Sequence, residues 1–266
     1  MIDRGKQALL GVRIDAVDYD AATAKVIAAA ADRVPFGVSA LAVHGVMEGV
    51  ADPELRYRLN RLELVTADGQ AVRWALNLLH RSGLPDRCYG PTLMLRVCEE
   101  AAAAGLPIYL YGSRYEVLAP LGTNLIERFP GLEVAGSSPS VFGRVDGDEL
   151  DAIAARIRAT GARMVFAGLG CPRQEVFAFE MRKRLGMPVL AVGAAFDYHA
   201  GLLKEPPMWV QRSGLQWLWR LLAEPKRLFR RYLSTNPAFM ARVALQKLGR
   251  PPRTAEQEPA AELGYA

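Results

Sequence analysis

Residues 163–192 read RMVFAGLGCPRQEVFAFEMRKRLGMPVLAV, and this stretch contains a complete strand–helix–strand unit. Two short apolar runs, Arg163–Ala167 and Pro188–Val192, have the length and composition of buried strands. Between them Pro172–Leu185 has the length of a helix, and Gly186 follows its last residue, as glycine often does at a helix end. Two parallel strands joined through a helix are the repeating unit of α/β proteins.

The same alternation extends outward from this unit. Further strands are predicted at Gly11–Val17, Gly37–Val43, Leu62–Thr66, Pro107–Tyr111 and Leu132–Ala135. Helices are predicted at Asp20–Ala31, Ala71–Leu79, Pro91–Ala104 and Glu149–Thr160, the last with Asp148 as its N-cap. The sequence therefore predicts an α/β fold, a Rossmann-like and mostly parallel sheet flanked by helices, over residues 1–203.

Composition narrows the class of protein. The chain is 51% hydrophobic and 23% charged, which is an ordinary globular balance. We find neither an apolar run of 18 residues nor the apolar stretch of a secretory signal near the N-terminus. The three cysteines are widely spaced, and no Cys-x-x-Cys pair occurs. This usage argues against a disulfide framework or a zinc site and favours a reducing cytosol.

The composition changes in the last quarter of the chain. Residues 204–254 carry eleven basic and two acidic side chains, a net +9, whereas the whole chain carries +5. Two helices are predicted there, Pro206–Ala223 and Pro225–Leu248, split at Glu224 and broken or kinked again at Pro237. A solvated charged face is one interpretation. The mixture of Trp and Arg favours a second, a basic, Trp-rich helical appendage over 204–250 that lies on an anionic membrane surface. Residues 251–266 are predicted to be a disordered tail.

The first candidate site follows a predicted strand, at Thr66-Ala67-Asp68-Gly69-Gln70. Ligands of open α/β sheets bind at the carboxyl ends of the strands, which is where Asp68 falls. A carboxylate there could accept a proton from an attacking sugar hydroxyl. The alternative is an N-cap, in which the aspartate satisfies the amides of the following helix.

The second candidate, Gly168-Leu169-Gly170-Cys171-Pro172-Arg173-Gln174-Glu175, also opens a helix. The glycines let the backbone approach a ligand, and a helix N-terminus with an arginine favours phosphate. The third glycine of the dinucleotide fingerprint is missing, so a plain glycine turn is the alternative. Two weaker strand-end candidates are Tyr111-Gly112-Ser113 and the loop 193–201, in which Asp197 and His199 could act as an acid–base pair or only satisfy loop backbone.

Two further groups of residues have competing readings. The Asp-x-Asp pairs at Asp18-Tyr19-Asp20 and Asp146-Gly147-Asp148 could hold a metal, but each precedes a predicted helix, which favours capping. The appendage carries four arginines that could instead close over a diphosphate: Arg220, Arg227, Arg230 and Arg231.

Six segments resemble one family in the same order, and the resemblance extends from Ala40 to about Tyr232, more than two thirds of the chain. They are 64–69, 111–113, 168–170 with 172–175, 193–197, 214–221, and 224–225 with 230–232. In these residues the chain resembles the WecG/TagA/CpsF glycosyltransferases of bacterial cell-surface polymer synthesis. The resemblance implies transfer of an N-acetylated amino sugar from a UDP donor to a polyprenyl-diphosphate-linked acceptor, with inversion and without a bound metal or other cofactor.

The resemblance also implies roles for individual residues. Asp68 takes the position of the catalytic base. The expected substrate-binding residues are His44, Gly69, Gln70, Tyr111, Gly112, Ser113, Gly168, Gly170, Pro172, Arg173, Gln174, Glu175, Asp197 and the four appendage arginines. The enzyme is expected in the cytoplasm on the inner face of the cell membrane, and the apolar appendage makes self-association conceivable.

Two departures from the family pattern stand out. The usual Thr-x-Asn segment near the second strand end is replaced by a stretch in which His44 is expected to fill the same space, and Gln216 stands where the family has Glu. The first departure keeps open an alternative, a non-catalytic nucleotide-sugar-binding partner of a polysaccharide assembly complex. Nucleic-acid binding is disfavoured, because a phosphate-tracking surface does not need so many Trp and Leu side chains.

Overall fold

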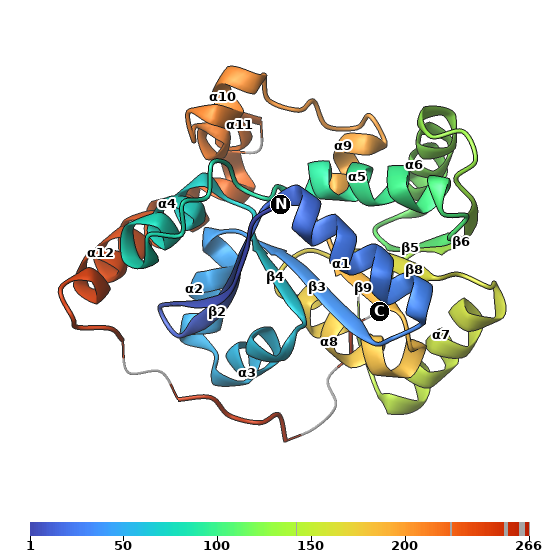
Figure 1. The fold of residues 1–266 in the computed structure, drawn as a ribbon, viewed down its shortest axis with the longest axis horizontal. Helices are drawn as coiled ribbons and strands as arrows, with labels where there is room; N and C mark the ends of the chain where they lie inside the picture. Colours follow the sequence, from blue (N-terminus) through green and yellow to red (C-terminus); the bar gives the residue numbers. More distant parts are fainter. Residues whose placement is uncertain (142, 224, 253–254, 261–263, 266) are drawn as a thin grey trace.

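The computed structural model describes residues 1–141, 143–223, 225–252, 255–260 and 264–265. An eight-stranded sheet forms its centre (Figure 1). In spatial order the strands are β1 (Asp3–Leu9), β2 (Val12–Val17), β4 (Leu64–Ala67), β3 (Phe36–Leu41), β9 (Pro188–Ala191), β8 (Met164–Gly168), β5 (Ile108–Gly112) and β6 (Val134–Ser138). Only β1 runs antiparallel to its neighbour in this sheet. The α/β class and the mostly parallel sheet expected from the sequence are therefore confirmed.

Helices cover both faces of the sheet and enclose two apolar cores (Figure 1). One layer holds α1 (Tyr19–Asp32), α5 (Gly90–Ala103), α6 (Tyr115–Arg128) and α9 (Ala195–His199). The opposite layer holds α2 (Val43–Ala51), α3 (Pro53–Arg61), α4 (Gln70–His80), α7 (Gly147–Ala159), α8 (Arg173–Leu185) and α12 (Pro225–Lys247). The fully buried strands explain why the sequence shows continuous apolar runs, which are typical of a parallel sheet covered on both faces.

Both Asp-x-Asp pairs contribute helix caps. The Asp18 carboxylate accepts a hydrogen bond from Ala21 N at 2.9 Å, and Asp146 accepts one from Glu149 N at 3.0 Å. The expected N-cap Asp148 is wrong by two residues. Asp146 has the extended backbone of an N-cap, so α7 begins earlier and Asp148 lies in its first turn.

Several elements were not expected from the sequence. Strand β1 is an edge strand with a polar sequence, so it lacks the apolar run that marks the inner strands. In the appendage, the single helix expected at 206–223 is two helices, α10 (Met208–Arg212) and α11 (Gln216–Ala223). They are separated at Gly214, whose φ of 76° is left-handed and whose missing Cβ leaves room for the Trp74 ring. Helix α12 is continuous through Pro237, so no break occurs there.

The second half of the appendage belongs to the core. Helix α12 packs against α2 and α4, and its Phe239 and Val243 side chains are buried in the same apolar cluster as those helices. Gln246 adds polar contacts near the end of α12, because its side chain accepts from Leu10 N at 2.8 Å and donates to Ala8 O at 3.0 Å.

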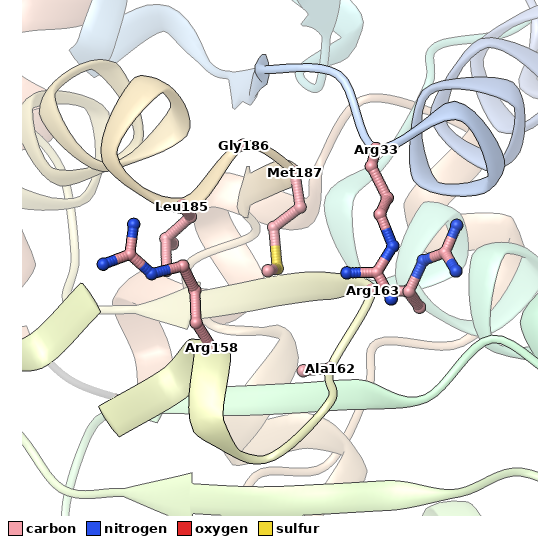
Figure 2. Close-up of a pocket in the computed structure, with 7 residues that line it drawn as sticks. All are labelled: Arg33, Arg158, Ala162, Arg163, Leu185, Gly186 and Met187. Atoms are coloured by element: carbon pink, nitrogen blue, oxygen red, sulfur yellow. The ribbon is translucent and has the colours of Figure 1, made fainter. Parts of the chain in front are cut away.

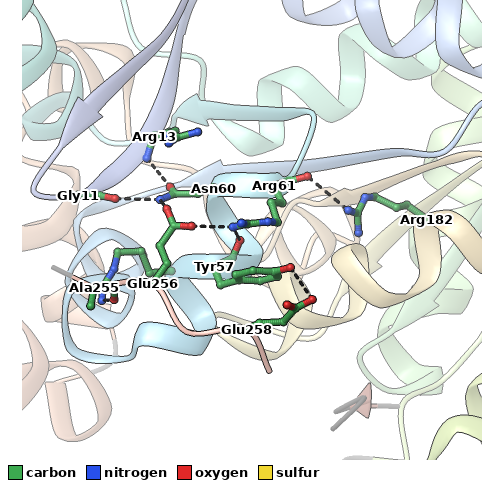
Figure 3. A network of polar contacts seen from close by, with 10 residues as sticks. Gly11, Arg13, Tyr57, Asn60, Arg61, Arg182, Ala255, Glu256 and Glu258 are labelled. Atoms are coloured by element: carbon green, nitrogen blue, oxygen red, sulfur yellow. Dashed lines mark hydrogen bonds and ion pairs between the residues drawn. The ribbon is translucent and has the colours of Figure 1, made fainter. Parts of the chain in front are cut away.

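The described residues of the segment 251–266 contact the body, where the sequence analysis expects disorder. Asn60 and Arg61 both donate to the Glu256 carboxylate at 2.7 Å, and Tyr57 donates to Glu258 at 2.8 Å (Figure 3). Further along, β10 (Gly264–Tyr265) pairs with β7 (Arg144–Val145) in a separate two-stranded sheet.

Candidate active site at the carboxyl edge of the sheet

The parallel strands bring most of the sequence motifs to one edge of the sheet. Leu41 pairs with Ala67, Ala167 with Ala191, and Gly112 with Gly168, so the strands end at nearly the same level. The loops that follow β3, β4, β5, β8 and β9 therefore share this edge, which we call the carboxyl edge. Most of the candidate site residues from the sequence lie at this edge. They are His44, Asp68, Gly69, Gln70, Gly112, Ser113, Gly168, Gly170, Pro172, Arg173, Gln174, Glu175 and Asp197.

A topological switch lies between β5 and β8 within this edge. The chain leaves β5 through α6 on one face of the sheet and leaves β8 through α8 on the other. Ligands of open α/β sheets bind where neighbouring connections diverge in this way. Gly112 and Gly168 meet at this point, because a Cβ on Gly112 would lie 3.0 Å from the Gly168 carbonyl carbon. Ser113 beside them has a left-handed φ of 59°, a strained conformation for a non-glycine residue that is frequent at functional sites.

Asp68 lies half-buried between β4 and α4. Its Oδ1 accepts a 2.6 Å hydrogen bond from Gly90 N, at the start of α5. Burial raises the pKa of the Asp68 carboxyl group, and the charges of Arg87 and Arg220 together with the Gly90 amide only partly oppose this. The structure assigns no capping hydrogen bond of α4 to this side chain, since Gly69 is the N-cap. A carboxylate with a raised pKa that does not cap its own helix is suited to accept a proton.

The loop after β9 connects Asp68 to the glycine turn after β8. A Cβ on Gly90 would lie 3.4 Å from Asp68 Oδ1 and 3.1 Å from the carbonyl oxygen of Val192. The next residue, Gly193, faces the side-chain amide of Gln174, which would lie 3.5 Å from a Cβ there. Asp68 and the Pro-Arg-Gln-Glu turn are thus linked by packing through Gly90, Val192 and Gly193 at the carboxyl edge.

The Gln174 side chain is oriented by its neighbours. Its Oε1 accepts from Gly170 N at 3.2 Å, and its Nε2 donates to Glu175 Oε1 at 3.0 Å. Glu175 is buried, and it also accepts from the Ser39 hydroxyl at 3.1 Å. Burial raises the pKa of the Glu175 carboxyl group, while the hydrogen bonds from Gln174 and Ser39 lower it. This network fixes the turn that opens α8.

Three candidate residues from the sequence have side chains that contact other parts of the protein. The Tyr111 ring is buried and stacks on Phe177 with 4.5 Å between ring centroids, so its side chain belongs to the core. His199 contacts the Pro91 carbonyl oxygen through Nε2 at 2.9 Å, which gives it a structural partner instead of an acid–base role with Asp197. Gln70 is also buried, and it donates to Asp86 at 2.9 Å.

The appendage reaches the same edge through Arg220 of α11, whose charge acts on Asp68. The side chains of Arg227, Arg230 and Arg231 lie outside the described part of the structure, although their backbone forms part of α12.

Sequence reasoning missed Arg87. This residue lies in the loop between α4 and α5, and its guanidinium stands 4.1 Å from the centroid of the Tyr89 ring. It also donates to the side chains of Gln211 and Gln216 in the appendage. These partners are more than 120 positions away along the chain. No local pattern could indicate them. The only sequence signal is an arginine just before the predicted N-terminus of a helix.

The opposite edge of the sheet holds a small cavity of about 90 Å³ (Figure 2). Three arginines line it, Arg33, Arg158 and Arg163. Arg163 donates to the Ala30 and Ala31 carbonyl oxygens at the end of α1, with distances down to 2.6 Å. Arg158 donates to Arg184 O at 2.7 Å, at the end of α8. Arg158 and Arg163 thus bind helix ends, and the cavity lies away from the carboxyl edge.

Fold and site together define an α/β protein with a mostly parallel sheet and a half-buried carboxylate at the strand ends. Residues 7–253 match the Glycosyl transferase WecG/TagA/CpsF family, so the chain belongs to that family. It is therefore a glycosyltransferase, of a family that acts in cell-surface polysaccharide synthesis. In general terms this membership implies a nucleotide-sugar donor and a lipid-linked acceptor. It also decides against the non-catalytic alternative.

Proposed function

We propose that this enzyme transfers a sugar, an N-acetylated amino sugar, from a UDP donor to a polyprenyl-diphosphate-linked acceptor. Asp68 is the general base, and the anomeric configuration inverts. The observation that carries this proposal is the Asp68 carboxylate itself. It is half-buried at the carboxyl edge, held by an amide at the start of α5 and accompanied by two arginine charges.

In the proposed reaction the acceptor hydroxyl oxygen attacks the anomeric carbon of the donor. Its proton passes to Asp68, and the bond between that carbon and the UDP oxygen breaks in the same step. Inversion follows because attack and departure occur on opposite faces of the sugar. The raised pKa of Asp68 makes it a stronger base than an exposed carboxylate, provided that the pH is high enough to ionise it.

The departing diphosphate needs positive charge. The N-terminus of α8, which follows the glycine turn after β8, supplies backbone amides for phosphate oxygens. Arg220 supplies a guanidinium, and we propose that Arg227, Arg230 and Arg231 add further charge. With these groups the reaction proceeds without a metal ion. Activity that persists undiminished in excess EDTA would support this part, and activity restored only by Mg²⁺ would refute it.

We further propose that the appendage lies on the inner face of the cell membrane. Among the described residues, no helix is long and apolar enough to cross a bilayer. Large apolar side chains of α10, α11 and α12 are exposed instead, with Trp209 at 67% and Leu222 at 74%. Aromatic and apolar side chains among arginines favour the interface of an anionic bilayer. Co-sedimentation with vesicles of anionic lipid, and its loss in Trp209→Ser/Leu222→Ser, tests this placement.

The decisive experiment is the Asp68→Asn variant. Asparagine can still accept from Gly90 N, so we expect a folded protein that binds UDP. Transfer from a panel of UDP-sugars to a lipid-diphosphate-linked acceptor should fall by about 10³-fold or more, because no base remains. Asp20→Asn, the same change at an exposed aspartate of α1, is the control. Near wild-type transfer by Asp68→Asn would rule out the catalytic assignment.

A further inference from the structure

Arg87 is a buried cation with neutral partners. Its side chain is 6% exposed. One guanidinium nitrogen donates to Gln216 Oε1, and another donates to Gln211 Oε1 at 3.3 Å. Within the described parts of the chain, no carboxylate lies within ion-pair distance of Arg87. Burying a charge without a counter-charge is costly, so the fold retains this arginine at the expense of stability.

The two glutamines hold the guanidinium without neutralising it. Gln216 Nε2 donates to the Tyr89 hydroxyl at 2.5 Å, and Gln211 Nε2 donates to Pro206 O at 2.9 Å. Because the Nε2 atom of each glutamine donates to another group, it is the Oε1 atom that contacts Arg87. Both glutamines belong to the appendage, whereas Arg87 and Tyr89 belong to the loop before α5.

The loop that carries Arg87 ends at the Asp68 carboxylate, which accepts a 2.6 Å hydrogen bond from Gly90 N, three residues after Arg87. Arg87 opposes the effect of burial on Asp68 more than any other group does, and Arg220 of α11 contributes less. Cys88 and Tyr89 also interact with Asp68, but both are neutral near pH 7, since burial raises the pKa of Cys88 to about 12 and that of Tyr89 still further. His44 begins α2 at the same edge and pairs with Glu48 at 3.5 Å.

We propose that Gln211 and Gln216 are positioning residues through which the docked appendage holds Arg87 as an unneutralised cation that keeps Asp68 ionised. This inference rests on the proposed function, in which Asp68 is the base. As a consequence, docking of the appendage is coupled to the ionisation of Asp68. When the amides release Arg87, the Asp68 carboxylate retains its proton to a higher pH, and transfer requires a higher pH.

The test is a direct titration of Asp68, which needs no substrate. Protein labelled with ¹³C at aspartate carboxyl groups is titrated by NMR, and the Asp68 resonance is the one missing from Asp68→Asn. Arg87→Met should raise the Asp68 midpoint by about one pH unit, the usual effect of losing a nearby opposite charge. Gln216→Leu should raise it by about half a unit. In the Arg87→Met background Gln216→Leu should add nothing, because the amide acts only through the arginine.

The control is Gln257→Leu at an exposed glutamine near α3, which should leave the midpoint unchanged. If Gln216→Leu does not fold, the Asp68 midpoint is measured in Gln211→Leu instead, with and without Arg87→Met. An unchanged midpoint in the single glutamine variant, or an equal rise with and without Arg87, overturns the inference. That result leaves the catalytic role of Asp68 intact, which the transfer assay of Asp68→Asn decides separately.

Discussion

The two edges of the sheet both carry arginines, but they use them differently. At the edge opposite the active site, Arg158 and Arg163 donate to carbonyl oxygens at helix ends, so their hydrogen bonds serve the fold. At the carboxyl edge, Arg87 is held by neutral amides, and its charge acts on Asp68. An arginine bound to backbone carbonyls contributes to stability. We propose that one held near the proposed base contributes to chemistry, at some cost in stability.

The largest expected difference between the edges is in catalysis. Arg87→Met should lower kcat/KM for transfer by up to about tenfold near neutral pH, because a rise of one unit in the pKa of Asp68 reduces its ionised fraction by at most that factor. Arg163→Met should leave kcat/KM within about twofold, because Arg163 lies at the other end of the strands. Steady-state assays of the two purified variants, corrected for the folded fraction, test the contrast. Equal losses of kcat/KM in the two variants would contradict the proposed difference between the two edges.

For the free energy of unfolding, we expect Arg163→Met to have a larger effect than Arg87→Met. Arg163→Met leaves carbonyl groups of Ala30 and Ala31 without their partner, which should cost about 1–3 kcal/mol in the free energy of unfolding. Arg87→Met removes a buried, unneutralised charge, so it should cost less than Arg163→Met. Urea denaturation of both variants at the same pH measures the difference. A larger loss for Arg87→Met would mean that its main role is structural.

A smaller effect should separate Asp68 from ordinary surface carboxylates. Its folded-state pKa lies above the unfolded value of 3.8. The protonated form is therefore favoured in the folded protein, and stability declines as the pH rises through the folded-state pKa. Asp68→Asn should be more stable than wild type at pH 7, by about 1.4 kcal/mol per unit of pKa elevation. The difference should vanish below pH 3.8. Equal stability at both pH values would contradict the raised pKa.

The smallest expected effect concerns Arg33. Its side chain is exposed at the opposite edge, so Arg33→Met should change the free energy of unfolding by at most about 0.5 kcal/mol. Transfer should be unchanged. Denaturation and assays alongside Arg163→Met would show whether arginines at that edge matter only where they bind helix ends.

The sequence was sufficient to predict the inner strands and the motif at Asp68, because both leave local patterns. A buried parallel strand is a continuous apolar run, and its end is marked by small and polar residues such as those of 66–70. The edge strand β1 has no such run, since Asp3–Leu9 is mostly polar. The role of Tyr111 could not be predicted either, because only packing shows that its ring stacks on Phe177.

Local sequence patterns could not predict contacts between segments that are distant in the chain. The Arg87 partners come from the appendage, and neither glutamine lies in a motif that indicates an arginine. The contacts of Glu256 with Asn60 and Arg61 likewise join a polar, Pro-containing segment to a helix far away in the chain. Low apolar content is the reason that disorder was predicted for this segment, but it does not indicate which side chains elsewhere in the protein bind it.

The burial of Phe239 and Val243 bears on how this enzyme can be re-engineered. A chimera that exchanges the appendage helices with those of another family member cannot be joined simply at residue 204. The graft must also bring the surfaces of α2 and α4 that receive α12, or the hybrid will carry a mismatched interior. Exchanging only α10 and α11 would leave that interior untouched, provided that the new helices keep Gln211 and Gln216, which hold Arg87.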